Sequence, residues 1–189
     1  MDEAAVVEGC RRGDRAAQRV FYEQHADRIY ALTLRMTDRP EDAFDLTQDT
    51  FLRAFQQFAN FDARAAAGTW LYRIAVNETL QFFRRRDRER TRLEASRPEA
   101  TGRTDDGTAA PAETDVAAAL ADLSLEHRVI LILKYQTGLD YAEIAEVLDC
   151  APGTVASRLN RARAELRRAL EAREAGEEPR RVRHPTSRG

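Results

Sequence analysis

A stretch almost without large apolar residues divides this chain into two. Between Arg92 and Asp115, Leu93 is the only large apolar side chain, and two prolines and two glycines interrupt the segment. Such a segment cannot bury enough apolar surface to offset the entropy of ordering it. We therefore predict a flexible linker between two loosely coupled folding units. The predicted boundaries are a first unit over 1–92, the linker over 93–115, a second unit over 116–173 and a disordered tail over 174–189.

The first unit has its apolar residues at helical rather than alternating spacing. Gly13 and Asp14 are typical of a helix end followed by an N-cap, and the run after them predicts a helix over 15–36. Asp38 is expected to cap the next helix, with Pro40 in its first turn. The phenylalanines of that helix recur along one face, which we expect to be buried. They are Phe44, Phe51, Phe55 and Phe58.

The second unit contains a helix-turn-helix pattern. Asp140 and Glu143 form a capping box, which predicts a short helix from Tyr141 to about Leu148. The next residues fit a tight turn, and Pro152 suits the first turn of a longer helix. Because four helices fit this unit, the predicted fold is all-α, with two small helical domains and a helix-turn-helix in the second.

The helix predicted from Pro152 has an apolar side and a polar, cationic side. Val155, Leu159, Ala162 and Leu166 are expected to face inward. A helix that enters a DNA major groove needs side chains that reach base edges, with arginines around them for phosphates. An ordinary core hairpin with a solvated arginine face is the alternative. The candidate DNA-binding residues are Thr154, Ser157, Arg158, Asn160, Arg161 and Arg163.

Two further candidate surfaces lie in the first unit. One is an acidic and amide face of the phenylalanine-bearing helix, separated from its phenylalanine stripe. The other lies along a helix predicted from about Thr69 into an arginine cluster, with Trp70 expected in the core. Solvated helix faces are the alternative for both. The first set is Asp45, Gln48, Asp49 and Leu52; the second is Arg73, Asn77, Gln81, Arg84, Arg85 and Arg86.

Charge is distributed in blocks, although the net charge is only −2. Residues 63–92 carry eight basic and three acidic side chains, 150–172 carry five and two, and the intervening 93–126 carry two and eight. Two basic stretches separated by an acidic one suit a protein that binds a polyanion and also meets a protein partner.

Other classes of protein are disfavoured. The sequence has neither a phosphate-cradling glycine loop nor a catalytic triad pattern, so we expect no catalytic residues and no enzyme. Two distant cysteines and three scattered histidines argue against disulfides, a metal site or a cofactor. Neither a signal peptide nor an apolar run of about 18 residues is present, which favours a cytoplasmic protein without a membrane span.

Two ordered motifs resemble the extracytoplasmic-function (ECF) group of bacterial sigma factors, the two-domain branch of the primary sigma family. The first motif is Asp45-Leu46-x-Gln48-Asp49-x-Phe51, followed by Trp70-Leu71-x-x-Ile74-Ala75-x-Asn77 and the arginine cluster. The second is Tyr141-Ala142-Glu143-Ile144-Ala145, followed by Gly153-Thr154-Val155-x-Ser157-Arg158-Leu159-x-Arg161-Ala162-Arg163. The resemblance covers roughly 14–92 and 116–172.

The resemblance implies a promoter-specificity subunit that directs transcription initiation and binds core RNA polymerase at the β′ coiled coil and the β flap. The Asp45 set would dock on polymerase, and the Arg73 set would bind the downstream promoter element as melted single strand. The helix from Pro152 would read the upstream element as duplex DNA. An anti-sigma factor is a further expected partner. A stand-alone helix-turn-helix regulator and a protein-only adaptor are the alternative functions.

Several positions depart from the family pattern. Ala156 stands where a lysine or arginine is common, and the loss of that cation is expected to weaken DNA attachment. Ala151 replaces the usual serine cap before the recognition helix. The other departures are Phe44 at a usually acidic position, Gln81 for a frequent Asp, Ser124 for Pro and Asp149 for Gly.

Overall fold

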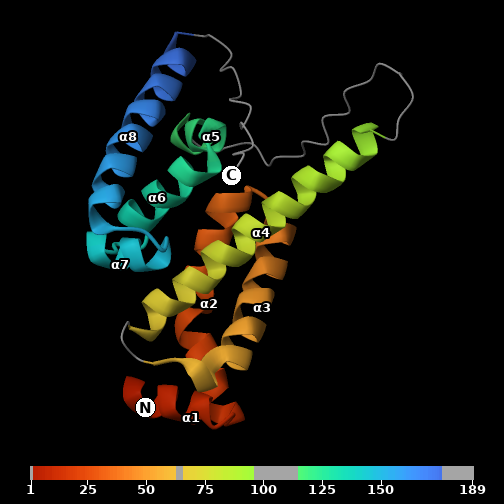
Figure 1. Cartoon of the computed structure of the whole chain (residues 1–189), viewed down its shortest axis with the longest axis vertical. Helices are drawn as coiled ribbons and strands as arrows, with labels where there is room; N and C mark the ends of the chain where they lie inside the picture. The colour runs from red at the N-terminus through yellow and green to blue at the C-terminus, as the bar shows by residue number, and fades with distance from the viewer. Residues whose placement is uncertain (1, 63–65, 96–114, 176–189) are drawn as a thin grey trace.

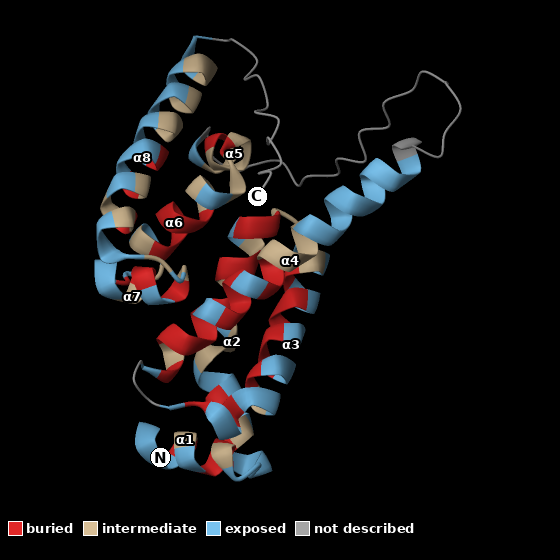
Figure 2. Cartoon of the chain, viewed as in Figure 1, coloured by how far each residue is buried: buried red, intermediate tan, exposed pale blue. Residues whose placement is uncertain are grey.

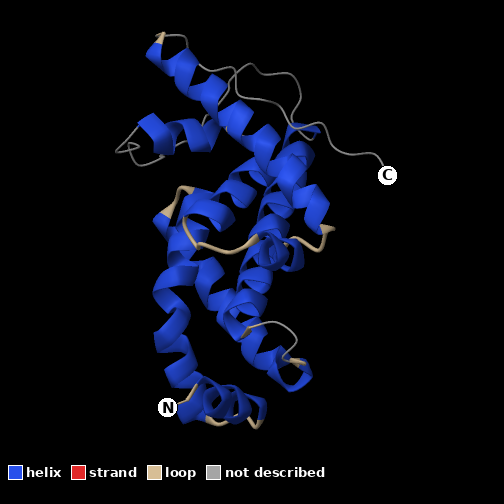
Figure 3. Ribbon diagram, turned by 90° about the vertical axis from the view of Figure 1, so that its left-hand side faces the viewer, coloured by secondary structure: helices blue, strands red, loops and turns tan. Residues whose placement is uncertain are grey.

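The computed structural model describes residues 2–62, 66–95 and 115–175, and every regular element in these ranges is helical (Figures 1 and 3). The predicted all-α fold is therefore confirmed. The first unit contains α1 (Glu3–Arg11), α2 (Arg15–Thr37), α3 (Pro40–Gln57), the 3₁₀ turn η1 (Phe58–Asn60) and α4 (Ala67–Ala95). The second contains α5 (Asp115–Asp122), α6 (Leu125–Tyr135), α7 (Tyr141–Val147) and α8 (Pro152–Glu174). Most of the predicted linker and tail falls on 96–114 and 176–189, outside the described residues.

Helices α2, α3 and α4 pack around an aromatic core, and α1 covers one end of it (Figure 2). Phe21 and Trp70 both pack edge-on against Phe58, with ring centroids 5.0 Å apart in each pair. Trp70 is buried, as the sequence predicts. Buried aromatic pairs in this edge-to-face geometry stabilise a core beyond the area they remove from water.

The junction between α2 and α3 differs from the sequence prediction. Asp38 is not the N-cap of α3 but the C-cap of α2, in the left-handed conformation with φ 58°, and its N–H donates to Leu34 O. The N-cap of α3 is Arg39, whose side chain lies 3.7 Å from the Asp42 carboxylate. Aspartate tolerates the left-handed region better than most residues. Asp38 therefore ends α2 and does not cap α3.

The predicted buried face of α3 is confirmed at Phe51 and Phe58 but is wrong at Phe44. Phe44 is 56% exposed, whereas the small residues Ala43, Thr47 and Ala54 are buried. Thr33 of α2 reaches this stripe: its hydroxyl donates to Ala43 O and lies 3.1 Å from the Thr47 hydroxyl. Because small side chains let the two helices approach closely, the phenylalanine at the start of α3 lies at the edge of the contact.

The second unit folds as its motifs predict. The Asp140 and Glu143 capping box is present in full at the start of α7. Asp149 adopts φ 48° in the turn, and Pro152 occupies the first turn of α8. Ile130, Ile144 and Leu159 are fully buried between α6, α7 and α8. The helix-turn-helix is therefore confirmed as a structural unit.

The two units, which the sequence predicts to be loosely coupled, contact each other directly. Helix α7 lies against α4, and α6 lies against α2 (Figure 1). Helix α4 also runs to Ala95, beyond the predicted end of the first unit at Arg92. None of the described helices is long and apolar enough to span a membrane.

Candidate nucleic-acid and polymerase interfaces

The candidate DNA-binding face of α8 is polar and open to solvent. Ser157, Asn160 and Arg161 are exposed, whereas Val155, Leu159 and Ala162 are buried. The Arg161 guanidinium lies along the helix, with Nε donating to Ser157 O at 3.3 Å. These three exposed residues fall within one turn near the N-terminal half of α8, which is where a recognition helix contacts base edges.

The flanking candidates of α8 differ from this exposed set. Thr154 and Arg158 are half-buried. Arg163 turns toward α6, where its Nε donates to the Tyr135 hydroxyl at 2.7 Å and its guanidinium lies 5.6 Å from the Tyr135 ring centroid. The structure thus brings Ser157, Asn160 and Arg161 together and leaves Arg163 at the side of this set, against Tyr135.

The polar residues of α4 border a cavity of about 260 Å³. Arg73 and Asn77 are exposed, and Gln81 is half-buried one turn further along. The cavity is also lined by Arg53 and Gln57 of α3, which the sequence interpretation missed. Since amides offer both donors and acceptors, this lining can hydrogen-bond the edge of an unpaired base.

Glu78 is the buried carboxylate beside this cavity, and it too was missed. Its Oε1 lies 2.6 Å from Arg53 Nε, so an arginine from α3 neutralises it. Without that pairing, a negative charge in the cavity wall would repel the phosphates of a nucleic acid strand. Arg53 and Gln57 could have been found from the sequence, because their i, i+4 spacing puts them on the side of α3 away from the phenylalanines.

The arginine cluster of α4 lies apart from the cavity. Arg84 is eleven residues beyond Arg73, a separation of roughly 16 Å along a helix axis. Arg84 and Arg85 are exposed, while Arg86 Nη1 lies 3.5 Å from the Asp42 carboxylate. The structure therefore gathers Arg73, Asn77 and Gln81 at one cavity and continues the cationic surface along the exposed end of α4.

The acidic face of α3 is exposed to solvent. Asp45, Gln48, Asp49 and Leu52 are all exposed, and Leu52 is 59% exposed. Phe44 lies beside them, so two large apolar side chains flank the carboxylates. An exposed surface that combines apolar and charged groups is typical of a protein–protein contact.

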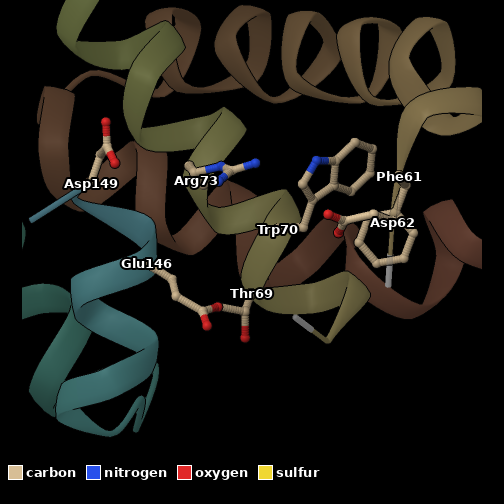
Figure 4. A pocket seen from close by; sticks show the side chains of 7 residues that line it. All are labelled: Phe61, Asp62, Thr69, Trp70, Arg73, Glu146 and Asp149. Atoms are coloured by element: carbon tan, nitrogen blue, oxygen red, sulfur yellow. The ribbon is translucent and has the colours of Figure 1, made fainter. Parts of the chain in front are cut away.

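A second cavity, of about 300 Å³, lies between the two units (Figure 4). Trp70 and Arg73 line it from α4, and Glu146 and Asp149 line it from the helix-turn-helix. Trp70 and Arg73 also line the first cavity, so the two cavities adjoin. The remaining lining residues are Phe61, Asp62 and Thr69.

The described part of the chain contains no group of three histidine, cysteine or acidic side chains placed to hold a metal ion. Cys10 is buried, and this burial raises the pKa of its thiol to about 11. A thiol with so high a pKa is neutral near pH 7 and unsuited to nucleophilic or metal chemistry.

Comparisons with known proteins agree with this architecture. Residues 21–89 match the model of sigma-70 region 2, and residues 114–166 match the model of sigma-70 region 4. The chain is 39% identical over 166 residues to the ECF RNA polymerase sigma factor SigE of Mycolicibacterium smegmatis, a match that covers 82% of this chain and 63% of that protein. It is 31% identical to the ECF sigma factor SigW of Bacillus subtilis, a match that covers 87% of this chain and 94% of SigW.

Two solved structures are similar as well. The sigma factor RpoE of Bartonella quintana, crystallised with the anti-sigma factor NepR, has a TM-score of 0.66 and 27% identity over 81% of this chain and 96% of that chain. CnrH in complex with the cytosolic domain of CnrY has a TM-score of 0.67 and 26% identity over 89% of this chain and 96% of that chain. The chain belongs to the sigma-70 family of RNA polymerase sigma factors, in its ECF group.

Proposed function

We propose that this sigma factor uses three surfaces in promoter-specific initiation, one for core polymerase and two for promoter DNA. The α3 face around Asp45 and Asp49 binds core RNA polymerase, the cavity beside Asn77 binds the melted downstream element, and the face of α8 around Arg161 binds the upstream element as duplex. The observation that carries the proposal is that one chain presents both an amide-lined cavity and an exposed recognition helix.

Upstream binding would combine contacts to phosphates with contacts to base edges. Arg158 and Arg163 flank the face of α8 that carries Ser157, Asn160 and Arg161. Phosphate contacts fix the register of a helix in the major groove, and side chains that reach base edges supply sequence preference. The exposed arginine at 161 is the strongest candidate for a bidentate contact to a guanine.

Downstream binding would stabilise DNA that has already opened. Removing a base from the stack costs a few kcal/mol, and stacking or hydrogen bonds to the captured base repay it. Asn77 and Gln81 supply amides at the cavity edge, and Arg73 supplies a cation for the adjoining phosphate. Binding the two promoter elements through one chain adds avidity that neither contact has alone.

We also infer that the chain is not an enzyme, acts in the cytoplasm and is regulated by an anti-sigma factor. The chain would contribute no reacting group of its own, because RNA synthesis belongs to core polymerase. It would act in the cytoplasm, where core polymerase works. One similar solved structure contains the anti-sigma factor NepR and the other contains the cytosolic domain of CnrY. The first supports an anti-sigma factor as a partner of this chain.

Footprinting of an initiation complex separates the two DNA roles. With core polymerase and a promoter, the Asn77→Ala/Gln81→Ala variant should protect the upstream duplex normally but lose permanganate-reactive, open DNA downstream. The Arg161→Ala variant should lose upstream protection first. The proposed division of labour is wrong if both variants lose both signals equally while polymerase binding is intact.

A further inference from the structure

Arg163 of α8 is held by a neighbouring helix of its own unit. Its Nε donates to the Tyr135 hydroxyl of α6 at 2.7 Å, and its guanidinium lies 5.6 Å from the centroid of the Tyr135 ring. Helices α6 and α8 pack against each other (Figure 1), so this contact joins the end of α6 to the middle of α8. A hydrogen bond and a cation–π contact therefore restrain a side chain that is exposed to solvent.

Two other exposed arginines of α8 are restrained in a different way. Arg161 Nε and Arg168 Nε each donate at 3.3 Å to a carbonyl oxygen of α8 itself. Those contacts stay within one helix. Arg163 instead reaches across to α6, so the position of its guanidinium is fixed relative to the fold of the whole unit.

Tyr135 contributes little to the core. It is the last residue of α6 and is 63% exposed, so its ring removes little apolar surface from water. Its hydroxyl accepts a hydrogen bond from Arg163, and a hydroxyl can donate as well as accept. Tyr135 can therefore hold Arg163 and donate its own proton to a ligand at the same time.

The pair of Tyr135 and Arg163 keeps donors for such a ligand. The guanidinium uses Nε at Tyr135, and Nη1 lies 3.5 Å from Asn160 Oδ1. Because an arginine has five N–H donors, the two on Nη2 remain without a partner among the described residues. A charged and a neutral donor side by side suit an oxyanion such as a phosphate. Asn160 lies on the proposed base-reading face, so this site borders that face.

A second cation and a second tyrosine lie next to this pair in the helix-turn-helix unit. Lys134 Nζ lies 5.2 Å from the ring centroid of Tyr141. The carboxylates nearest to Tyr141 in the sequence, Asp140 and Glu143, bond to backbone N–H groups in the capping box. Two cations beside two tyrosines therefore favour a negatively charged ligand at this surface.

We propose that Tyr135 is a positioning residue for upstream DNA: it holds Arg163 against one DNA phosphate and donates its own hydroxyl proton to that phosphate. The inference rests on the proposed function. A side chain that is restrained before binding loses less conformational freedom in the complex, so the held arginine binds more tightly than a mobile one. The alternative is a purely structural role, in which the arginine stabilises the C-terminal end of α6.

Binding of the full chain to duplex DNA tests the proposal. Tyr135→Phe keeps the ring and removes the hydroxyl, so affinity for a promoter duplex should fall several-fold while the salt slope stays unchanged. Arg163→Ala should reduce the slope by about one unit, because a cation is lost. Tyr22→Phe, which removes a hydroxyl from an exposed tyrosine of α2, is the matched control and should bind as the parent does. Fluorescence anisotropy titrated against salt measures all three variants, and parent-like affinity of Tyr135→Phe would overturn the proposal.

A double-mutant cycle shows whether Tyr135 acts through Arg163. In an Arg163→Ala background, Tyr135→Phe should weaken binding less than it does in the parent, because the hydroxyl no longer has an arginine to hold. Equal effects in the two backgrounds would overturn the positioning role. A loss confined to the promoter duplex, with unrelated duplex bound normally, would overturn the assignment to a phosphate.

The NMR signal of the Arg163 Nε–H group tests the held pair without DNA. In the free chain this proton should exchange slowly with water, and Tyr135→Phe should speed the exchange while Tyr22→Phe should not. An exchange rate that Tyr135→Phe leaves unchanged would overturn the proposal. A lower urea midpoint with unchanged DNA affinity would favour the structural alternative and overturn it too. A parent chain that binds no promoter duplex would overturn the proposed function, whereas a parent that binds no better than Tyr135→Phe would overturn this inference alone.

Discussion

Arg53 Nε lies 2.6 Å from Glu78 Oε1, a pair that joins α3 to α4 beneath the cavity of Asn77 and Gln81. The Glu78 side chain is nearly buried, whereas Arg53 is about half exposed. Losing the arginine therefore leaves a carboxylate in a poorly hydrated position, and losing the carboxylate leaves an arginine that water can reach.

This asymmetry gives the first prediction. Arg53→Met should lower the free energy of unfolding by about 1–2 kcal/mol, below the full cost of breaking a buried pair because the arginine is partly solvated. Glu78→Gln, which keeps the shape, should cost less. Urea unfolding followed by circular dichroism measures both. A larger loss for Glu78→Gln would show that the pair does not stabilise the cavity wall in this way.

Reversing charge on the acidic face of α3 should abolish polymerase binding. In Asp45→Arg/Asp49→Arg, two exposed carboxylates become cations, and neither takes part in the core. The matched control is Glu23→Arg/Asp27→Arg, which makes the same change at the same spacing on α2. Pull-down of core polymerase should be lost only in the first variant. Unchanged pull-down by a well-folded first variant would exclude this face as the docking site.

Restoring a cation at position 156 should tighten attachment to upstream DNA. Ala156 is half-buried beside the exposed face of α8 that we propose binds upstream DNA. Ala156→Arg should add one phosphate contact and steepen the salt dependence of binding by about one unit. Fluorescence anisotropy of a promoter duplex, titrated against salt, measures the slope. A gain confined to one DNA sequence would indicate a base contact instead.

Arg161→Ala should act in the opposite direction. A bidentate contact from Arg161 to a base would contribute roughly 1–3 kcal/mol of discrimination. The variant should therefore lose affinity for its promoter more than for unrelated DNA. Equal losses on both DNAs would assign Arg161 to phosphate.

A cap can be added to the recognition helix. Ala151 is the N-cap of α8 and has extended backbone angles, φ −67° and ψ 143°, but its side chain has no oxygen for the first N–H groups. Ala151→Ser should raise the stability of the chain by about 1 kcal/mol. Ala164→Ser, exposed within the same helix, should not stabilise. Urea midpoints compare the two variants.

His25 should make stability depend on pH. Burial lowers the pKa of His25, Arg28 lowers it further, and Glu3 acts in the opposite direction. The folded state thus binds fewer protons than the unfolded chain, whose histidine titrates near about 6.5. Stability should fall as the pH drops below that value, and His25→Gln should remove this part of the slope. An unchanged slope in His25→Gln would assign the pH dependence to other groups.

The sequence predicted those parts of the fold that depend on local chemistry. Residue types at short spacing predict the capping box of Asp140 and Glu143 and the inward face of α8, and both predictions are confirmed. The predictions for Asp38 and Phe44 were wrong, each for its own reason. An aspartate suits either end of a helix, and the α2–α3 contact runs over small residues rather than the large ones whose periodicity is easiest to see.

Contacts between distant elements were not predictable. Arg128 bonds to backbone carbonyls of α2 and α5, and any residue could supply those acceptors. Arg53 and Gln57 reach the cavity only because α3 packs on α4. Arg73, Asn77 and Gln81 could be placed on one face from their spacing, but the cavity beside them required the packing of two helices.

Promoter-specific transcription by purified core polymerase tests the central claim most directly. Core polymerase alone should give no defined transcript from the promoter upstream of a gene that this chain controls, and added chain should give one transcript with a single start site. Asp45→Arg/Asp49→Arg should abolish that transcript, and Glu23→Arg/Asp27→Arg should not. A defined transcript that forms without the chain, or one that the first variant supports as well as the parent, would contradict the account.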